Sequence, residues 1–123
     1  MFKVTPENED IYRVELSAPR SPLDEDDFFN FFNQIFDKER FGILLKVEGD
    51  KSFSPAAKKY LGYWFKSNRT RLKTKCFAFV RLRSFVDNDK LMKMKKAMPC
   101  PYFEFIMECD AITTLKDQSE ILL

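Results

Sequence analysis

Histidine is absent from the 123-residue chain. This side chain supplies the general base of Ser–His–Asp and Cys–His catalysis, and it is the commonest metal ligand and the usual proton shuttle near neutral pH. Cysteine is scarce as well. The three cysteines lack the CxxC spacing of a zinc site, and their odd number fits reduced thiols rather than a disulfide framework. We therefore predict a protein without catalytic residues, a metal or a cofactor.

Long apolar segments are also missing. The longest apolar run, Cys76–Val80, is far shorter than the ~20 residues that a membrane-spanning helix needs, and no leader-like segment opens the chain. Glycine is limited to three residues, and no Gly/Ser-rich linker divides the sequence. We expect a cytoplasmic protein without a transmembrane segment, folded as a single domain over residues 1–123.

Charged residues are plentiful but unevenly distributed. Residues 1–50 carry six basic and twelve acidic side chains, residues 51–96 carry fourteen and two, and residues 97–123 carry one and five. The net charge of +2 therefore conceals a basic middle segment between two acidic ends. Complementary charged surfaces of this kind favour docking to a protein partner or to a second copy in a homodimer.

Apolar periodicity predicts the secondary structure. Strands are expected at 2–5, 11–17, 43–48, 76–82 and 102–107, and helices at 23–40, 54–73, 85–98 and 110–122. The resulting order, ββαβαβαβα, alternates strands with helices. It predicts an α/β fold with a mainly parallel sheet, an antiparallel N-terminal edge strand and four helices.

Two helices contain residues that are candidates for more than core packing. The apolar stripe of the first helix is wide, so Phe29 and Phe36 at its margins are candidate contacts for a protein partner. In the second helix, Trp64 lies on the predicted inner face and Asn68 follows one turn later. A buried amide needs a hydrogen-bond partner, so we expect Asn68 either to bind a neighbouring loop or to face a ligand.

The outer face of the second helix is basic. Lys59, Lys66 and Lys73 recur every seven residues, close to two helical turns, and Arg69 flanks them. We interpret these four residues as a protein-interaction surface. As an alternative, the basic helices 54–73 and 85–98 bind a polyanion, either nucleic acid or an anionic membrane surface. Nucleic acid is the less favoured of the two because the chain contains no known nucleic-acid motif. A further alternative is an apolar small molecule or lipid, since the chain contains 14 phenylalanines.

Several short segments together resemble a known family. They are Phe41–Leu45, Ser54-Pro55, Trp64-Phe65, Asn68-Arg69, Cys76–Val80 and Pro99–Pro101. With the order of elements, they make the chain similar to the STAS domain (sulfate transporter and anti-sigma-factor antagonist) of the SpoIIAA-like fold, and in particular to an uncharacterised bacterial STAS-like subfamily. The resemblance implies a non-enzymatic regulatory or adaptor domain that binds a protein partner.

Anti-anti-sigma members of that family are switched by phosphorylation of a serine in an Asp-Ser-x-Gly motif. The matching region here reads Ser52-Phe53-Ser54-Pro55-Ala56-Ala57, so the Asp-Ser pair is missing and an alanine stands near the position of the phosphorylated serine. Ser52 and Ser54 are the nearest hydroxyls and are the candidate phosphorylation sites. Ser54 is also a suitable cap for the following helix.

Overall fold

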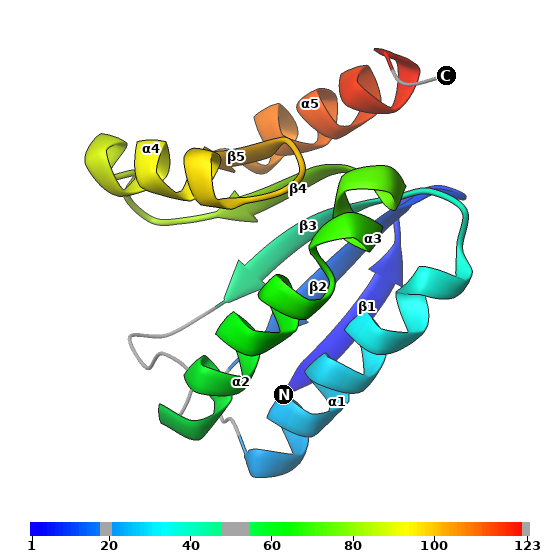
Figure 1. Ribbon diagram of the computed structural model, residues 1–123. Helices are drawn as coiled ribbons and strands as arrows, with labels where there is room; N and C mark the ends of the chain where they lie inside the picture. Colours follow the sequence, from blue (N-terminus) through cyan, green and yellow to red (C-terminus); the bar gives the residue numbers. More distant parts are fainter. Residues whose placement is uncertain (18–20, 48–54, 122–123) are drawn as a thin grey trace.

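A computed structural model describes residues 1–17, 21–47 and 55–121. Its centre is a five-stranded sheet, formed by β1 (Phe2–Pro6), β2 (Ile11–Leu16), β3 (Phe41–Val47), β4 (Cys76–Leu82) and β5 (Tyr102–Phe105). The strands lie side by side in sequence order (Figure 1). β1 pairs antiparallel with β2, and the other neighbours pair in parallel. The predicted α/β class, the mainly parallel sheet and the antiparallel edge strand are thus confirmed.

The helices differ in number from the prediction. They are α1 (Pro22–Gln34), α2 (Pro55–Ser67), α3 (Arg69–Lys75), α4 (Asn88–Ala97) and α5 (Glu108–Ile121), with a 3-10 turn, η1 (Ile35–Asp37), after α1. Two helices, α2 and α3, replace the single helix predicted at 54–73. The break lies at Asn68, whose backbone (φ −108°, ψ 20°) leaves the helical region. The carbonyl oxygen of Trp64 accepts from both the backbone N–H and the side-chain amide of Asn68, each at 3.0 Å, and asparagine favours such local bonds at the ends of helices.

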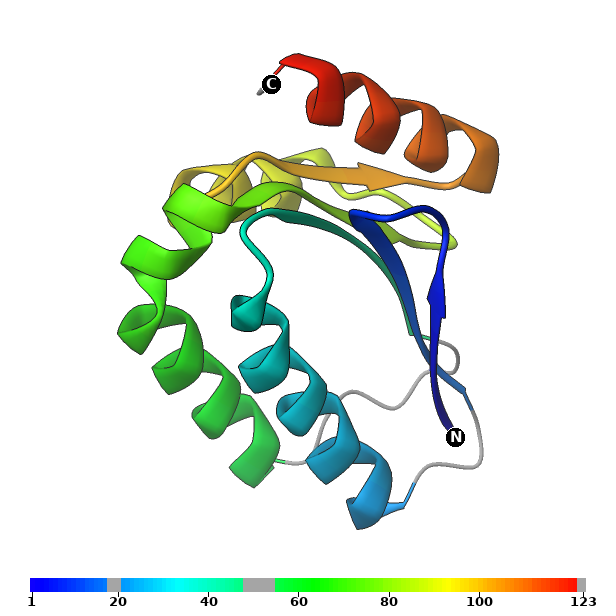
Figure 2. The ribbon, with the colours of Figure 1, turned by 90° about the vertical axis from the view of Figure 1, so that its right-hand side faces the viewer.

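The connecting helices cover one face of the sheet and α5 covers the other. α1 and α2 lie on the concave side of the curved sheet, and α5 lies on the opposite side (Figure 2). α4 also packs against the first face, because Leu91 and Met94 contact the core cluster that contains Trp64. This placement agrees with right-handed crossovers between strands in sequence order, which put every connecting helix on the same face.

The second face is held together by a close approach between β3, β4 and α5. The register of β3 and β4 shifts at Phe41/Gly42, so that Phe77 is the extra residue of a bulge. The Phe77 ring lies where a side chain on Gly42 would project, and Leu115 of α5 lies beside it. The guanidinium of Arg40 lies 4.8 Å from the centre of the same ring and donates to the Ser119 carbonyl at 2.7 Å. Gly42 is therefore needed for this packing.

In the described part of the chain, no helix has the length and apolar character required to cross a bilayer.

Candidate functional site

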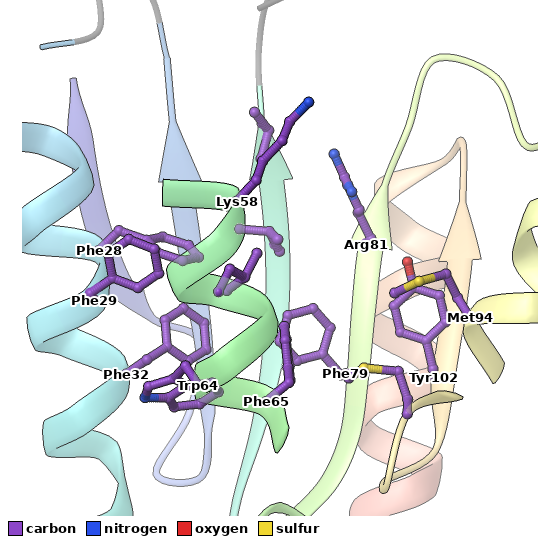
Figure 3. A pocket seen from close by; sticks show the side chains of 14 residues that line it. Phe28, Phe29, Phe32, Lys58, Trp64, Phe65, Phe79, Arg81, Met94 and Tyr102 are labelled. Carbon is purple, nitrogen blue, oxygen red and sulfur yellow. The ribbon is translucent and has the colours of Figure 1, made fainter. Parts of the chain in front are cut away.

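The main candidate site is an apolar pocket of about 250 Å³ between the sheet and the helices of its first face (Figure 3). The side chains around it come from α1, α2, the α4 region and the three strands β3, β4 and β5. They are Phe28, Phe29, Phe32, Leu45, Val47, Lys58, Leu61, Trp64, Phe65, Phe79, Arg81, Met94, Met98 and Tyr102.

Local periodicity explains why these residues face one space. Alternate residues of a strand point to the same side of a sheet, so Phe79 and Arg81 of β4 lie on one face while Val80 between them lies on the other. On α2, Lys58 and Leu61 are three residues apart and therefore share one side of the helix. The pocket is thus formed where the apolar stripes of α1 and α2 oppose the carboxyl-terminal halves of β3 and β4.

Aromatic rings connect the helices to the sheet and form one wall of the pocket. Phe32 of α1 packs edge-to-face on Trp64 of α2 at a centroid distance of 5.6 Å, and it stacks on Phe79 of β4 at 6.2 Å. Phe79 in turn stacks on Tyr102 of β5 at 6.1 Å. Such contacts fix the ring orientations, so the wall is largely preformed.

The polar atoms of this wall have hydrogen-bond partners within the protein. The indole N–H of Trp64 donates to Asn33 Oδ1 at 2.7 Å. The Tyr102 hydroxyl donates to Glu104 Oε2 at 2.6 Å, and Arg83 forms an ion pair with the other oxygen of Glu104 at 2.9 Å. Burial, reinforced by the hydrogen bond to Glu104, raises the pKa of Tyr102 to about 12. Tyr102 is therefore a neutral aromatic wall at physiological pH and is not a proton donor to a bound molecule.

Two cations lie at one end of the pocket. Lys58 and Arg81 both extend toward the carboxyl ends of β3 and β4 (Figure 3). In the described ranges neither forms an ion pair with a carboxylate, and Arg81 Nε is buried without a hydrogen-bond partner. Burial lowers the pKa of the Arg81 guanidinium and the neighbouring Arg83 lowers it further, although the Tyr102 hydroxyl and the Glu104 carboxylate oppose the shift. Arginine stays charged under these conditions, so the described residues that line this end of the pocket contribute positive charge.

The pocket is large for a domain of 123 residues. It is partly open to solvent, and its lining lacks the contacts that a filled core provides. A bound apolar molecule would supply them.

The predicted interaction residues on the basic segment lie outside this pocket. Lys59 and Lys66 of α2 and Arg69 and Lys73 of α3 are all exposed. Since the helix breaks at Asn68, Lys73 belongs to a different helix from Lys59 and Lys66. Arg69 donates to the Ala97 carbonyl at 3.1 Å and so links α3 to the end of α4.

Other predicted site residues need correction. Phe29 and Phe36 were expected at the margin of a helix stripe, but their exposed fractions are 8% and 7%, because Phe29 packs on Tyr60 and Phe36 stacks on Trp64. Neither residue therefore presents a surface to a protein partner. Asn68 is half-buried, and its amide donates to the Trp64 carbonyl in the last turn of α2 rather than to a neighbouring loop or into the pocket. Ser52 and Ser54 lie outside the described residues.

Lys58 and Arg81 were not among the predicted site residues. A signal for Arg81 was present in the sequence, because it is the one charged residue in the strand Cys76–Leu82 and shares the parity of Phe79. Lys58 had no comparable signal among the many lysines of its segment.

Comparisons of the chain with protein-family models, with curated proteins and with solved structures find no match. Within residues 1–17, 21–47 and 55–121, no group of three or more acidic or cysteine side chains is placed to hold a metal ion.

Proposed function

We propose that this protein is a non-enzymatic binding domain whose pocket takes an apolar small molecule. The observation that carries the proposal is the pocket itself, an apolar space of about 250 Å³ in a domain of only 123 residues. For comparison, an engineered cavity of about 150 Å³ with a similar lining binds benzene, which has six carbons. In proportion, this pocket has room for about ten carbon atoms.

The single tryptophan of the chain provides a direct assay, because Trp64 lines the pocket. We expect 1-decanol to change the fluorescence of Trp64 in a saturable manner, and to raise the free energy of unfolding as its concentration exceeds the dissociation constant. Isothermal titration calorimetry gives the stoichiometry, which should be one ligand per chain.

A pair of matched variants separates the pocket from the rest of the core. Val47 and Val4 are both half-buried strand valines that pack against the same core, but only Val47 lines the pocket. Val47→Trp should weaken 1-decanol binding at least about tenfold, as expected when a bulky side chain occupies the site, whereas Val4→Trp should retain it. Calorimetry is the readout, since each variant adds a second tryptophan. A folded Val47→Trp variant that binds as tightly as the unmodified protein would exclude this pocket.

A second function is supported by the exposed lysines of α2 and α3. We propose that a STAS-like domain of this kind docks an acidic protein partner on Lys59, Lys66 and Lys73. The support is that these side chains are exposed, and in the described part of the chain none of them forms an ion pair. Charged residues arranged in this way increase the specificity and the rate of association.

The test replaces Lys59, Lys66 and Lys73 together by glutamate. Thermal stability should be nearly unchanged, because exposed charges contribute little to folding, while capture of the partner that copurifies with the unmodified protein should be lost. Binding of the unmodified protein to nucleic acid or anionic liposomes, with a steep salt dependence, would instead support the polyanion alternative.

A further inference from the structure

We propose that Lys58 and Arg81 bind an anionic end group, so that the pocket takes a single-chain amphiphile with a carboxylate or phosphate at one end. This inference rests on the proposed function and assigns the chemistry of its ligand. The apolar tail would occupy the space lined by Trp64, Phe79 and Leu61. The charged end would lie beside Lys58 and Arg81.

Two cations of the described lining form no ion pair with a carboxylate. Trp64 and Tyr102 direct their hydrogen-bond donors to Asn33 and Glu104, as described above. Apart from these two, the described residues that line the pocket are apolar except for Lys58 and Arg81. A ligand that fits both parts of the lining therefore has an apolar body and a negatively charged end.

Arg81 lies near the Tyr102 hydroxyl and the Glu104 carboxylate, but it forms no ion pair in the described residues. The residue opposite Arg81 on β5 is Glu104. One oxygen of the Glu104 carboxylate accepts a hydrogen bond from Tyr102, and the other forms an ion pair with Arg83. Arg81 is half-buried and its Nε is fully covered without a hydrogen bond. A covered Nε without an acceptor is unfavourable, and an oxyanion that accepts from it would satisfy this donor.

Lys58 complements Arg81 from the opposite side of the pocket. It is exposed and lies on α2, whereas Arg81 lies on β4, and both side chains extend toward the same end of the space (Figure 3). A neutral ligand would leave Arg81 unsatisfied, and a cationic ligand would be repelled by both residues. Lys58 and Arg81 thus distinguish ligands by the charge of the end group when the apolar tails are of equal length.

The experiment compares ligands that differ only in their end group. Decanoate, decyl phosphate and 1-decanol are titrated into the protein below their aggregation concentrations, at low ionic strength, with Trp64 fluorescence as the signal. At least one of the two anions should bind about tenfold more tightly than 1-decanol, as expected for hydrogen bonds to a charged group. The tighter of the two anions identifies the end group.

Variants then test the two cations. Arg81→Met keeps most of the side-chain volume and should weaken binding of the preferred anion about tenfold, with 1-decanol changed less than twofold. Lys58→Met should weaken the anion about threefold, as expected for an exposed charge. The control is Lys59→Met, since Lys59 is also exposed but does not line the pocket, and this change should leave binding of the anionic amphiphile unchanged.

The outcomes separate this inference from the proposed function. If all three ligands bind equally, or if Lys59→Met weakens the anion as much as Lys58→Met does, the assignment of an anionic ligand is overturned and the apolar pocket stands. If none of the ligands binds, the proposed function is overturned as well. If Arg81→Met does not fold, the Lys58→Met and Lys59→Met pair still decides the question, because both positions are exposed.

Discussion

Replacing Gly42 by alanine tests the close packing of β3, β4 and α5. A Cβ atom at position 42 would lie 2.5 and 2.7 Å from Cε1 and Cζ of Phe77, and 3.1 Å from a methyl group of Leu115. Carbon atoms in favourable contact are about 3.5–4.0 Å apart. The new methyl group therefore overlaps the Phe77 ring by about 1 Å, and either the ring or the strand must move.

The surroundings of Phe77 decide how much this movement costs. The ring is 2% exposed, lies at the bulge in β4 and has the Arg40 guanidinium 4.8 Å from its centre. Overpacking of such a site costs about 1–3 kcal/mol, and the greater backbone rigidity of alanine returns about 0.5–1 kcal/mol. We expect Gly42→Ala to lower the free energy of unfolding by about 1–2 kcal/mol.

Gly62 provides a matched control for the same chemical change. It lies in α2, is exposed, and has no neighbouring atom within 4 Å of the position that a Cβ would take. Gly62→Ala should therefore raise the free energy of unfolding by about 0.5–1 kcal/mol, because alanine is the better helix former.

Urea unfolding followed by Trp64 fluorescence and circular dichroism measures both effects, with an unchanged m-value as the criterion for a pure stability change. Phe77→Leu lacks the two ring atoms that would clash, so the cost of Gly42→Ala should largely disappear in that background. The reasoning is refuted if Gly42→Ala is neutral or stabilising, or if its cost is the same with leucine at position 77.

Two further predictions concern the pocket wall. Trp64 is 3% exposed, so Trp64→Ala should lower the free energy of unfolding by about 3–5 kcal/mol. Urea titrations followed by circular dichroism measure this loss, and a value below about 1 kcal/mol would contradict the central position of Trp64 in the core. The pKa of Tyr102 is raised to about 12. The phenolate absorbance that the unmodified protein shows and Tyr102→Phe lacks should therefore titrate near pH 12 while the protein is folded. Tyrosines of the unfolded chain titrate at about 10, so the folded state holds the Tyr102 proton more tightly than the unfolded state does. The contribution of Tyr102 to the free energy of unfolding is therefore complete below pH 10 and is lost as the pH rises toward 12. The difference in free energy of unfolding between the unmodified protein and Tyr102→Phe should fall over that range, and no change there would contradict the shift.

Much of the fold could be predicted from the sequence because it depends on local periodicity. The five strands were located within a few residues, and the helices between them implied parallel pairing. The burial of Trp64 followed from the three- and four-residue spacing of its helix face. An apolar run such as Cys76–Val80 similarly indicated a strand covered on both faces.

Local patterns were insufficient where two conformations compete. The apolar stripe continued through Asn68, so one helix was expected from 54 to 73, but the side-chain amide of Asn68 binds the carbonyl oxygen of Trp64 and two helices form. Similarly, the apolar stripe of the helix predicted at 23–40 could not show whether Phe29 and Phe36 cover the core or its margin. Their burial depends on Tyr60 and Trp64, which belong to another helix.

By itself, then, the sequence determined which residues form strands and helices and which faces are apolar, because these properties depend on neighbours a few positions apart. Only the tertiary structure decided where α1 and α2 fit the sheet imperfectly and leave a pocket of about 250 Å³. It also brought Lys58 and Arg81, which are far apart in the chain and belong to different elements, to one end of that space. Both features depend on how large side chains from separate elements fill the distance between a helix and a sheet, and periodicity along one segment contains no information about that fit.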